Sequence, residues 1–389
     1  MKFNLEKKDI DSALLSLSAV ADKKQTLPVL SNILIKAHEN GLNMLSTDLE
    51  IELEINVENV VVEEPGEITI PARKVSDIVK ELPDGKISFS CEEGEEGKKF
   101  KIKTSTGQYN LVTIEALNFP EFSFTEFDKE YEINSEELLE LFQMTSFAMG
   151  NLDYRNFLNG IYIECAMGSL KMVATDAHRL AMYKKEFSAE AEFNAIIPRK
   201  TCIELMRLIP KVNEKIKFSI DQNRIVFSSS KFIFKSKLID AIYANYNQVI
   251  PSGDFTEIKV NRKELLDVVS RVSVLSNEKF KGVKLISEGT VLKLFSSNNN
   301  QDSAEEELQL EVANEGFNIA FNAFYLQEML NTIDDESISI LDFGGIMEKI
   351  PKGKDINGDE IFEERFKSSG VIIKTSNHDR TLVLMPILL

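Results

Sequence analysis

Two spacings of apolar residues alternate along this chain, and the same order of spacings occurs three times. Apolar residues three or four positions apart, as in Ile10, Leu14 and Leu17, predict amphipathic helices. Alternation with a period of two, as from Ile216 to Phe218, predicts strands. Each copy predicts a strand, a helix, strands, then a strand, a second helix and strands. We therefore expect an α+β domain with an internal pseudo-twofold, repeated three times.

The spacing of the copies shows that the repeat is a domain. Asn4, Asn134 and Asn261 lie in the first predicted strand of each copy and are about 130 residues apart, which is far more than a solenoid unit. Proline at the first helical position loses no hydrogen bond, so Pro71 and Pro198 are expected to open the second helix of two copies. A later strand of each copy ends in a short polar motif: Ser46-Thr47-Asp48, Ala174-Thr175-Asp176 and Ser296-Ser297-Asn298. The predicted domains are residues 1–125, 126–252 and 253–389.

Composition fits a multidomain protein of the cytoplasm. The chain has 389 residues, of which 43% are hydrophobic, enough for about two to four domains with buried cores. It shows neither a charged-apolar leader at Met1 nor an apolar run near ~18 residues, so secretion and membrane spanning are not expected. Cys91, Cys165 and Cys202 are an odd number in predicted helices and strands, so we expect reduced core residues.

Charge gives a mixed signal about nucleic acids. The net charge of −18 argues against ordinary DNA binding, which depends on Lys and Arg neutralising phosphates. Basic residues nevertheless concentrate on the predicted helices: Lys7, Lys8, Arg73, Lys74, Lys80, Arg199, Lys200, Arg207, Arg262, Lys263 and Arg271. If the helices lined one surface, that surface could be positive on an acidic protein. From charge alone, solvated helix faces are the favoured interpretation.

Signatures of catalysis and of cofactor binding are weak. The three histidines His38, His178 and His378 share no metal-ligand spacing, and Asp359 replaces the lysine of a phosphate loop after Gly353 and Gly358. We therefore expect no enzyme, no metal and no cofactor. The segment 349–370 is interpreted as a charged, mobile insertion between two strands.

Two segments invite a binding interpretation beside a structural one. Thr175 to Leu180 ends a strand where the other copies diverge, and Val383 to Leu389 ends the chain on apolar residues. The first segment could be a capped turn in which Arg179 pairs with an acid. The second could be a last core strand, although chain ends are usually polar unless they are docked. Both segments could instead line a binding surface.

Several motifs together resemble the family of bacterial replicative sliding clamps, the β subunit of DNA polymerase III. They are the threefold repeat, Thr26–Leu30, Ala174–Leu180, Leu275–Val283 and Met385-Pro386. The likeness runs from Met1 to Leu389, and only 349–370 looks additional. It implies three DNA-clamp domains, each with two helices and antiparallel sheets, and a head-to-tail dimeric ring around duplex DNA. A topological link needs only weak phosphate contacts, so it tolerates the acidic composition.

The resemblance also implies partners and site residues. The family is a non-catalytic processivity factor that receives the DNA polymerase III α subunit, the clamp loader, other polymerases and repair proteins at one peptide pocket. The implied pocket residues are Leu158, Thr175, Ala177, His178, Arg179, Leu180, Val249, Phe280, Asn322, Tyr325, Val383, Leu384, Met385 and Pro386. The implied DNA contacts are Lys23, Lys24, Asn151, Tyr154 and Arg155, to which charge adds Arg73, Arg199 and Lys200. The implied dimer seam joins Lys74, Tyr109 and Leu111 to Val274 and Leu275 of the other chain.

The sequence departs from the family pattern at a few of these places, and two other function classes stay open. Ala177 replaces a usual glycine, Leu152 a polar residue, Ala244 a proline, Gln248 a basic residue and Leu388 an arginine. The main alternative is an acidic, repeat-built interaction scaffold that never encircles DNA. A hydrolase using Asp176 and His178 is a distant third.

Overall fold

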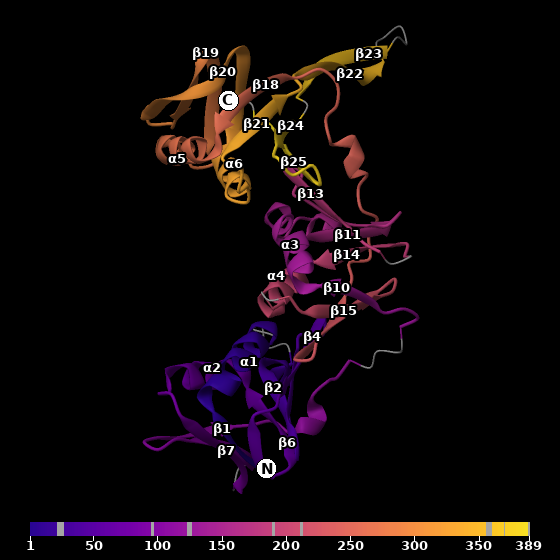
Figure 1. The fold of residues 1–389 in the computed structure, drawn as a ribbon, viewed down its shortest axis with the longest axis vertical. Coiled ribbons are helices and arrows are strands. Elements are labelled where there is room, and N and C mark those ends of the chain that lie inside the picture. The colour runs from indigo at the N-terminus through magenta and orange to yellow at the C-terminus, as the bar shows by residue number, and fades with distance from the viewer. Residues whose placement is uncertain are drawn as a thin grey trace. The chain divides into compact units, whose positions relative to one another are not determined.

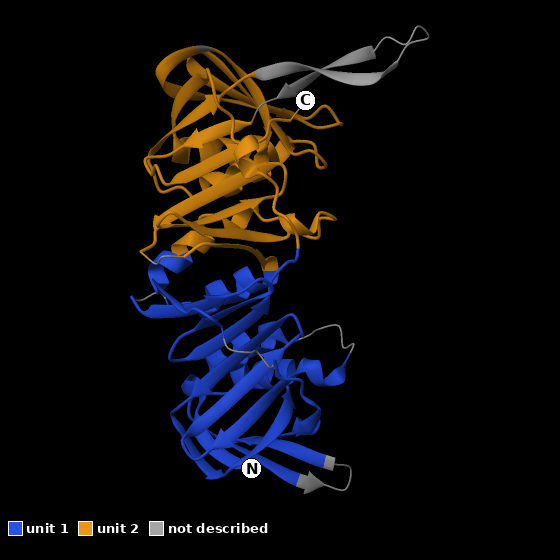
Figure 2. Ribbon diagram, turned by 90° about the vertical axis from the view of Figure 1, so that its right-hand side faces the viewer, with its two compact units in different colours: residues 1–139, 200–240 blue, residues 140–199, 241–389 orange. Residues whose placement is uncertain are grey.

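A computed structural model describes residues 1–21, 27–94, 97–122, 127–188, 191–210, 213–354, 360–368 and 370–387. The chain forms two compact units, which Figure 2 colours separately. Unit 1 comprises residues 1–139 and 200–240, and unit 2 comprises residues 140–199 and 241–389. The division between the units therefore runs through the middle predicted domain.

Each of the three repeats contributes two α-helices, as the apolar spacing predicts (Figure 1). They are α1 (Lys7–Val20), α2 (Ala72–Glu81), α3 (Ser135–Gln143), α4 (Arg199–Leu208), α5 (Arg262–Val272) and α6 (Ala323–Leu330). The short 3-10 helices are η1 (Pro28–Ser31), η2 (Ala116–Asn118), η3 (Ser146–Ala148), η4 (Asn156–Leu158), η5 (Tyr246–Gln248) and η6 (Ser273–Leu275). In α1, the residues spaced three or four apart, Ile10, Leu14 and Leu17, are all buried, which confirms the predicted amphipathic helix.

Unit 1 is built on two antiparallel sheets. Its strands are β1 (Lys2–Glu6), β2 (Asn32–His38), β3 (Gly41–Thr47), β4 (Ile51–Val57), β5 (Val60–Glu64), β6 (Gly66–Pro71), β7 (Lys86–Gly94), β8 (Gly97–Lys103), β9 (Gln108–Val112), β10 (Tyr131–Asn134), β15 (Lys215–Ile220), β16 (Arg224–Ser228) and β17 (Phe232–Lys237). One sheet has the order β5-β1-β7-β8-β9, and the other has the order β10-β15-β16-β17-β4-β3-β2-β6.

Unit 2 contains a second eight-stranded sheet and two ribbons. Its strands are β11 (Gly160–Ala166), β12 (Ser169–Thr175), β13 (Arg179–Glu186), β14 (Phe193–Pro198), β18 (Thr256–Asn261), β19 (Gly282–Ser297), β20 (Ser303–Asn322), β21 (Ser337–Asp342), β22 (Gly345–Lys354), β23 (Glu360–Ser368), β24 (Val371–Lys374) and β25 (Arg380–Leu384). The sheet has the order β14-β11-β12-β13-β25-β24-β21-β18, and the ribbons are β19-β20 and β22-β23.

Both large sheets join strands of neighbouring repeats, which the sequence pattern did not predict. In unit 1, β17 pairs with β4, so Lys235 lies opposite Glu52. In unit 2, β13 pairs with β25, so Leu180 lies opposite Val383. Backbone hydrogen bonds therefore continue from one repeat into the next inside each unit.

Pro71 and Pro198 stand one position earlier than predicted. Each is the last residue of a strand, and helices α2 and α4 begin at the following residue. Pro71 has an extended backbone (φ −62°, ψ 108°) at the N-cap of α2. The reason is that β6 and β14 are edge strands of their sheets, where proline costs no ladder hydrogen bond.

The expected insertion is partly regular. Strands β22 and β23 pair from Gly345 opposite Ser368 to Lys354 opposite Glu360, so the segment begins four residues earlier than position 349 and is a hairpin. The segment lies between strands β21 and β24, as expected for an insertion between two strands, but it is a paired hairpin where an irregular segment was expected. Residues 355–359 and 369 lie outside the described part of the chain.

Two smaller expectations concern cysteines and membrane spans. Cys91, Cys165 and Cys202 are free thiols, of which Cys165 and Cys202 are buried and Cys91 is half-buried. Across the described ranges, no helix is both long and apolar enough to span a membrane.

Candidate functional site

A capped turn joins β12 to β13 in unit 2. The Thr175 hydroxyl donates to the carbonyl of Arg179 at 2.7 Å, and the carboxylate of Asp176 accepts the backbone N–H groups of His178 and Arg179. Ala177 takes a left-handed conformation with φ 70°, which explains why glycine is usual there. The capped turn, one of the two interpretations of this segment, is confirmed.

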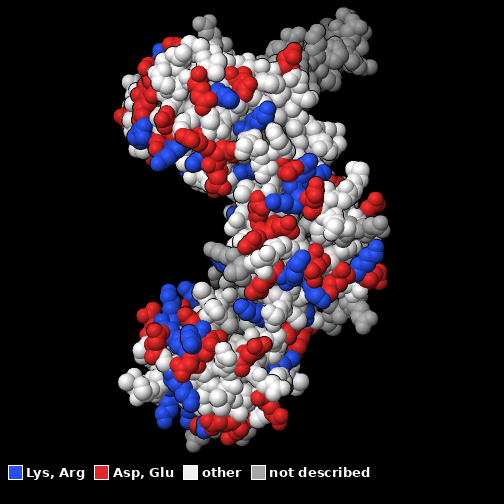
Figure 3. All heavy atoms as spheres, viewed as in Figure 1, with Lys and Arg blue, Asp and Glu red and all other residues white. Residues whose placement is uncertain are grey.

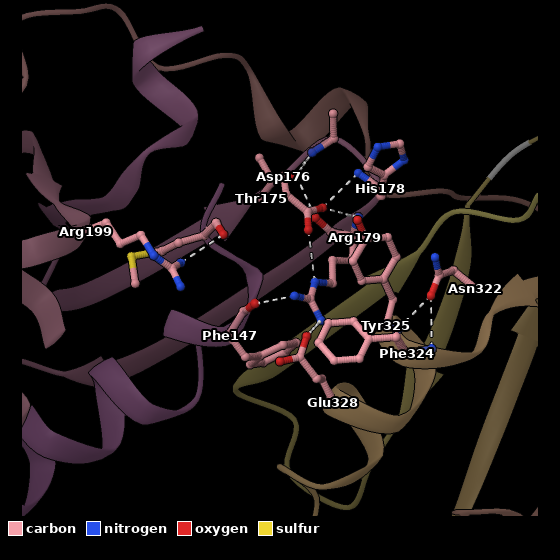
Figure 4. A network of polar contacts seen from close by, with 12 residues as sticks. Phe147, Thr175, Asp176, His178, Arg179, Arg199, Asn322, Phe324, Tyr325 and Glu328 are labelled. Carbon is pink, nitrogen blue, oxygen red and sulfur yellow. Dashed lines mark hydrogen bonds and ion pairs between the residues drawn. The ribbon is translucent and has the colours of Figure 1, made fainter. Parts of the chain in front are cut away.

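Arg179 connects this turn to two other elements of unit 2 (Figure 4). Its guanidinium pairs with Asp176 at 3.1 Å and with Glu328 of α6 at 2.7 Å, and donates to the carbonyl of Phe147 in η3 at 2.6 Å. The rings of Phe147 and Tyr325 lie 5.3 and 4.6 Å from it. Its side chain is 5% exposed, so the two carboxylates compensate an otherwise costly buried charge, although Nη1 and the facing Glu328 oxygen make no hydrogen bond.

Beside the turn lies a buried apolar cluster formed by Val173, Leu180, Tyr246 and Val383. Half-buried apolar residues pack against it: Tyr162, Met182, Tyr243, Ile250, Ile372 and Met385. Because β25 is an inner strand of the sheet, Val383 and Leu384 are buried, which confirms the interpretation of a last core strand. The tail beyond it is docked: Met385 donates its N–H to His178 and Ile387 to Ala320.

The segment that follows β17 is fixed to the apolar cluster by aromatic contacts. Tyr243 stacks on Tyr162 with centroids 4.7 Å apart, and the Tyr246 hydroxyl lies 3.2 Å from Glu164 and 3.0 Å from Lys171. Burial and the Glu164 carboxylate raise the pKa of Tyr162 to about 12, so it stays neutral and stacked near neutral pH. Sequence reasoning missed these tyrosines because their partners are distant along the chain.

A cavity of about 760 Å³ opens on the other side of the turn, and it unites residues that were predicted for different roles. His178, Arg179 and Tyr325 from the predicted peptide pocket line it together with Asn151, Tyr154 and Arg199 from the predicted DNA contacts. The remaining lining residues are Phe147, Met149, Gly150, Leu152, Asp153, Asp176, Phe324 and Glu328. His178 stacks on Tyr325 with centroids 5.7 Å apart, and Asn322 caps α6, which orients Tyr325.

The predicted pocket residues differ widely in exposure. Four of them are buried in the core and are not accessible to a ligand: Leu158, Leu180, Val383 and Leu384. Thr175, Asn322, Tyr325, Met385 and Pro386 are half-buried, and Ala177, His178, Val249 and Phe280 are exposed. The departures Ala244 and Gln248 are exposed, and Leu388 lies outside the described residues. Phe147 and Glu328 also belong to the site, but neither stands in a motif that could have indicated it.

Several of the predicted DNA contacts already have protein partners. Lys200 pairs with Asp48 at 2.6 Å and also donates to a backbone carbonyl of α1, both within unit 1. Arg199 donates to the carbonyl of Met149. Arg155 forms a two-bonded pair with Asp153, and these bonds lower the pKa of Asp153 to about 2.

Other predicted DNA contacts are exposed to solvent. Arg73 and Tyr154 are 85% and 88% exposed, and Asn151 is exposed as well. Figure 3 shows Lys and Arg side chains gathered around α2 of unit 1, the helix that carries Arg73 and Lys74. Lys23 and Lys24 lie outside the described residues.

The predicted seam residues lie in three elements: Lys74 in α2, Tyr109 and Leu111 in β9, and Val274 and Leu275 in η6. Tyr109 and Leu111 belong to β9, which is the last strand of its sheet and is paired on one side within the described residues. Lys74, Tyr109 and Val274 are exposed, whereas Leu111 and Leu275 are half-buried. In the described ranges, no group of three or more His, Cys, Asp or Glu side chains could hold a metal ion.

Comparison with known proteins assigns the chain to a family over most of its length. The family model of the DNA polymerase III beta subunit matches in three parts: the N-terminal domain at residues 1–123, the central domain at 132–245 and the C-terminal domain at 247–347. The beta sliding clamp of Pseudomonas aeruginosa is 36% identical over 347 residues, which are 88% of this chain and 93% of that protein. That of Escherichia coli K12 is 32% identical over 343 residues, with the same coverage.

Solved structures agree. A DnaN sliding clamp from P. aeruginosa, solved with griselimycin bound, matches with a TM-score of 0.86 and 33% identity, covering 100% of both chains. The C. crescentus beta sliding clamp matches with a TM-score of 0.87 and 28% identity, covering 100% of this chain and 99% of that one. The chain therefore belongs to the family of the DNA polymerase III beta subunit, and it is a DNA sliding clamp, a non-catalytic processivity factor of the replicative polymerase.

Proposed function

We propose that two copies of this chain close head to tail into a ring around duplex DNA in the cytoplasm. Each copy would contribute three clamp domains, at residues 1–125, 126–252 and 253–389. Six domains, each with two helices, would give the ring a helical lining and leave no exposed sheet edge at the seams. The free edge strand β9 supports this closure, because an unprotected edge needs a partner.

Charge complementarity supports a seam between the first repeat and the third repeat of another copy. Beside β9, strand β8 carries Lys99 and Lys103, which are exposed. On β20, Glu305 and Glu307 are exposed, and within the described residues the strand ladder of β20 pairs it with β19 alone. Opposite charges along two edges would set the register of the seam, while Tyr109, Leu111, Val274 and Leu275 would supply its apolar contacts.

For DNA, we propose contacts that are few and independent of sequence. Arg73, Asn151 and Tyr154 are exposed and would reach the backbone, together with Lys23 and Lys24. Arg155, Arg199 and Lys200 have partners inside the protein, so their contribution would be weaker. Diffuse contacts of this kind permit sliding, because no base edge is read.

For partners, we propose one peptide site, used in turn by the polymerase α subunit, the clamp loader and other polymerases and repair proteins. The observation that carries this proposal is the 760 Å³ cavity bounded by the His178–Tyr325 stack. The docked tail is linked to this stack by the hydrogen bond from the Met385 N–H to the His178 carbonyl. A peptide with a glutamine followed by leucine and a terminal Leu-Phe pair would bind there. Burying on the order of 200–300 Å² at about 25 cal/mol per Å² gives about 5–7.5 kcal/mol before association costs, which limits the affinity to the micromolar range.

The ring is tested at its seam. In a variant with Val274→Glu and Leu275→Glu, closing the seam would bury unpaired charge at a cost of roughly several kcal/mol. The variant should therefore be monomeric. Light scattering should give twice 44.0 kDa for the wild type and half of that for the variant. Only the wild type should be retained on circular DNA and lost from linear DNA. A wild-type monomer at micromolar concentration would contradict the ring.

The peptide site is tested at the tail. Removing Met385 to Leu389 deletes the hydrogen bonds to His178 and Ala320 and the apolar contact of Met385 with the cluster. Calorimetry should then detect no peptide binding, while light scattering still reports a dimer because the proposed seam lies elsewhere. Unchanged peptide affinity would show that the site has been misplaced.

A further inference from the structure

We propose that Arg179 is a positioning residue that couples the 147–155 loop, where we place DNA contacts, to the peptide site, an inference that rests on the proposed function. The family resemblance counts Arg179 among the residues that contact a partner. The structure shows instead that its side chain faces other parts of the protein and is 5% exposed.

The contacts of Arg179 leave little for a ligand. Nε donates a hydrogen bond to Asp176 and Nη2 to the carbonyl of Phe147. Nη1 forms an ion pair with Glu328 at 2.7 Å without hydrogen-bond geometry. Its Cζ atom also lies over the rings of Phe147 and Tyr325, 5.3 and 4.6 Å from their centroids (Figure 4). A planar guanidinium can donate hydrogen bonds from several nitrogens and stack on aromatic rings at the same time, which a lysine ammonium cannot do.

These partners line the same cavity but come from different elements of unit 2. Phe147 lies at the start of the loop that carries Asn151, Tyr154 and Arg155, all three of which are predicted DNA contacts. Tyr325 stacks on His178, and the carbonyl of His178 holds the docked tail at Met385. A displacement of Tyr325 on peptide binding would therefore shift the guanidinium and, through the carbonyl of Phe147, the loop. By thermodynamic reciprocity, a loop held by DNA would in turn alter peptide affinity.

A second capped turn, at Asp221–Arg224, makes it possible to separate the proposed coupling role of Arg179 from its role in capping a turn. Asp221 accepts the backbone N–H groups of Asn223 and Arg224 and pairs with the Arg224 guanidinium, the same pattern as Asp176 with His178 and Arg179. Arg224 also covers an aromatic ring, that of Phe127, at 4.9 Å. It therefore repeats the local turn but belongs to unit 1, whereas the 147–155 loop and α6 belong to unit 2.

The test is hydrogen exchange of the 147–155 loop in the full-length dimer, with and without the Gln-Leu…Leu-Phe peptide. In the wild type, saturating peptide should slow exchange in the loop about fivefold or more. In Arg179→Lys, peptide affinity should fall about tenfold, and loop exchange should no longer respond at saturating peptide. Glu328→Gln, which keeps the side-chain shape, should show an intermediate response and serves if Arg179→Lys does not fold.

Arg224→Lys is the matched control and should respond as the wild type does. A full loop response in both Arg179→Lys and Glu328→Gln would overturn the coupling role. Loss of the response in Arg224→Lys would overturn it as well, because any capped turn would then matter equally. If the wild type binds peptide but its loop does not respond, the coupling is wrong and the peptide site stands. If the wild type does not bind peptide at all, the proposed function itself fails.

Discussion

The turn at Thr47–Ile51 in unit 1 and the turn at Thr175–Arg179 in unit 2 have the same backbone. In both turns, the threonine hydroxyl donates to the carbonyl of the residue four positions later. The carboxylate of the following aspartate accepts the backbone N–H groups two and three positions after itself. The third residue is left-handed in both, with φ 72° at Leu49 and 70° at Ala177. The last three residues of the two turns differ in sequence although their backbone geometry is the same. The repeat is therefore better preserved in structure than in sequence.

The strand pair after each turn distinguishes the two regions. In unit 1 the cross-strand pair is Glu52 opposite Lys235, an ion pair at 2.7 Å whose carboxylate is fully buried. Glu52 also accepts the backbone N–H of Phe122 at 2.7 Å, which fixes the connection to the next repeat. In unit 2 the equivalent pair is Leu180 opposite Val383, two apolar side chains within the cluster beside the docked tail.

The turns themselves are covered differently. Leu49 packs against a buried cluster that includes Val29, Leu30 and Phe119, and Asp48 is bound by Lys200. Ala177 and His178 are exposed, and the adjoining cavity is open. The comparison teaches that the same backbone turn can be covered by side chains from distant parts of the chain or left exposed.

The largest expected effect comes from giving unit 2 the ion pair of unit 1. Leu180→Glu combined with Val383→Lys should reduce peptide affinity about a hundredfold or more, because charges replace apolar support and burying them costs several kcal/mol. Calorimetry measures the loss, and light scattering should still report a dimer. The matched control, Glu52→Leu with Lys235→Val in unit 1, should bind peptide normally. Normal binding by the first variant would contradict the equivalence of the two regions.

The ion pair of unit 1 gives the next largest effect. Glu52→Leu alone removes the charge partner of the half-buried Lys235 and the acceptor of the Phe122 N–H, so the free energy of unfolding should fall by about 3 kcal/mol. Adding Lys235→Val should restore the part of this loss that comes from the unpaired ammonium, because an apolar pair needs no charge compensation, while the Phe122 N–H still lacks its Glu52 acceptor. Denaturant unfolding followed at its first transition provides the measurement. A double variant no more stable than the single one would show that the pair does not act as a unit.

The smallest effect concerns the left-handed residues. Ala177→Gly should raise the free energy of unfolding by about 0.5 kcal/mol, because relief of the left-handed strain exceeds the entropy that glycine gains in the unfolded chain. Leu49→Gly relieves the same strain but removes an apolar side chain from its cluster, so its net effect should be destabilising. Thermal unfolding of the two variants side by side gives the comparison. Equal changes in the stability of the two variants would mean that the packing of Leu49 against its cluster does not stabilise the fold.

Much of the local structure could be predicted from residue patterns. The apolar spacing in α1 and the alternation in β15 correspond to buried faces, and the repeated order of elements gives two α-helices in each repeat. The interpretations of Thr175–Arg179 as a capped turn and of Val383-Leu384 as a core strand were both correct. Motifs at these places carried the family resemblance, which the comparisons confirmed.

The remainder depended on contacts between residues far apart in the chain. Nothing near Arg179 in the sequence indicates Phe147 or Glu328, and nothing near Glu52 indicates Lys235. The hairpin of β22 and β23 was missed because its charged, proline-containing sequence lacks a clear strand period.

The sequence by itself determined the threefold repeat, the helices and strands, the acidic composition and the family. Only the tertiary structure decided that β17 continues the sheet of β4, that β25 continues that of β13, and that one turn is covered while the other is open. The physical reason is that periodicity reports which face of an element is buried, whereas the partner of that face is fixed by strand register and by the few side chains that the register places opposite one another.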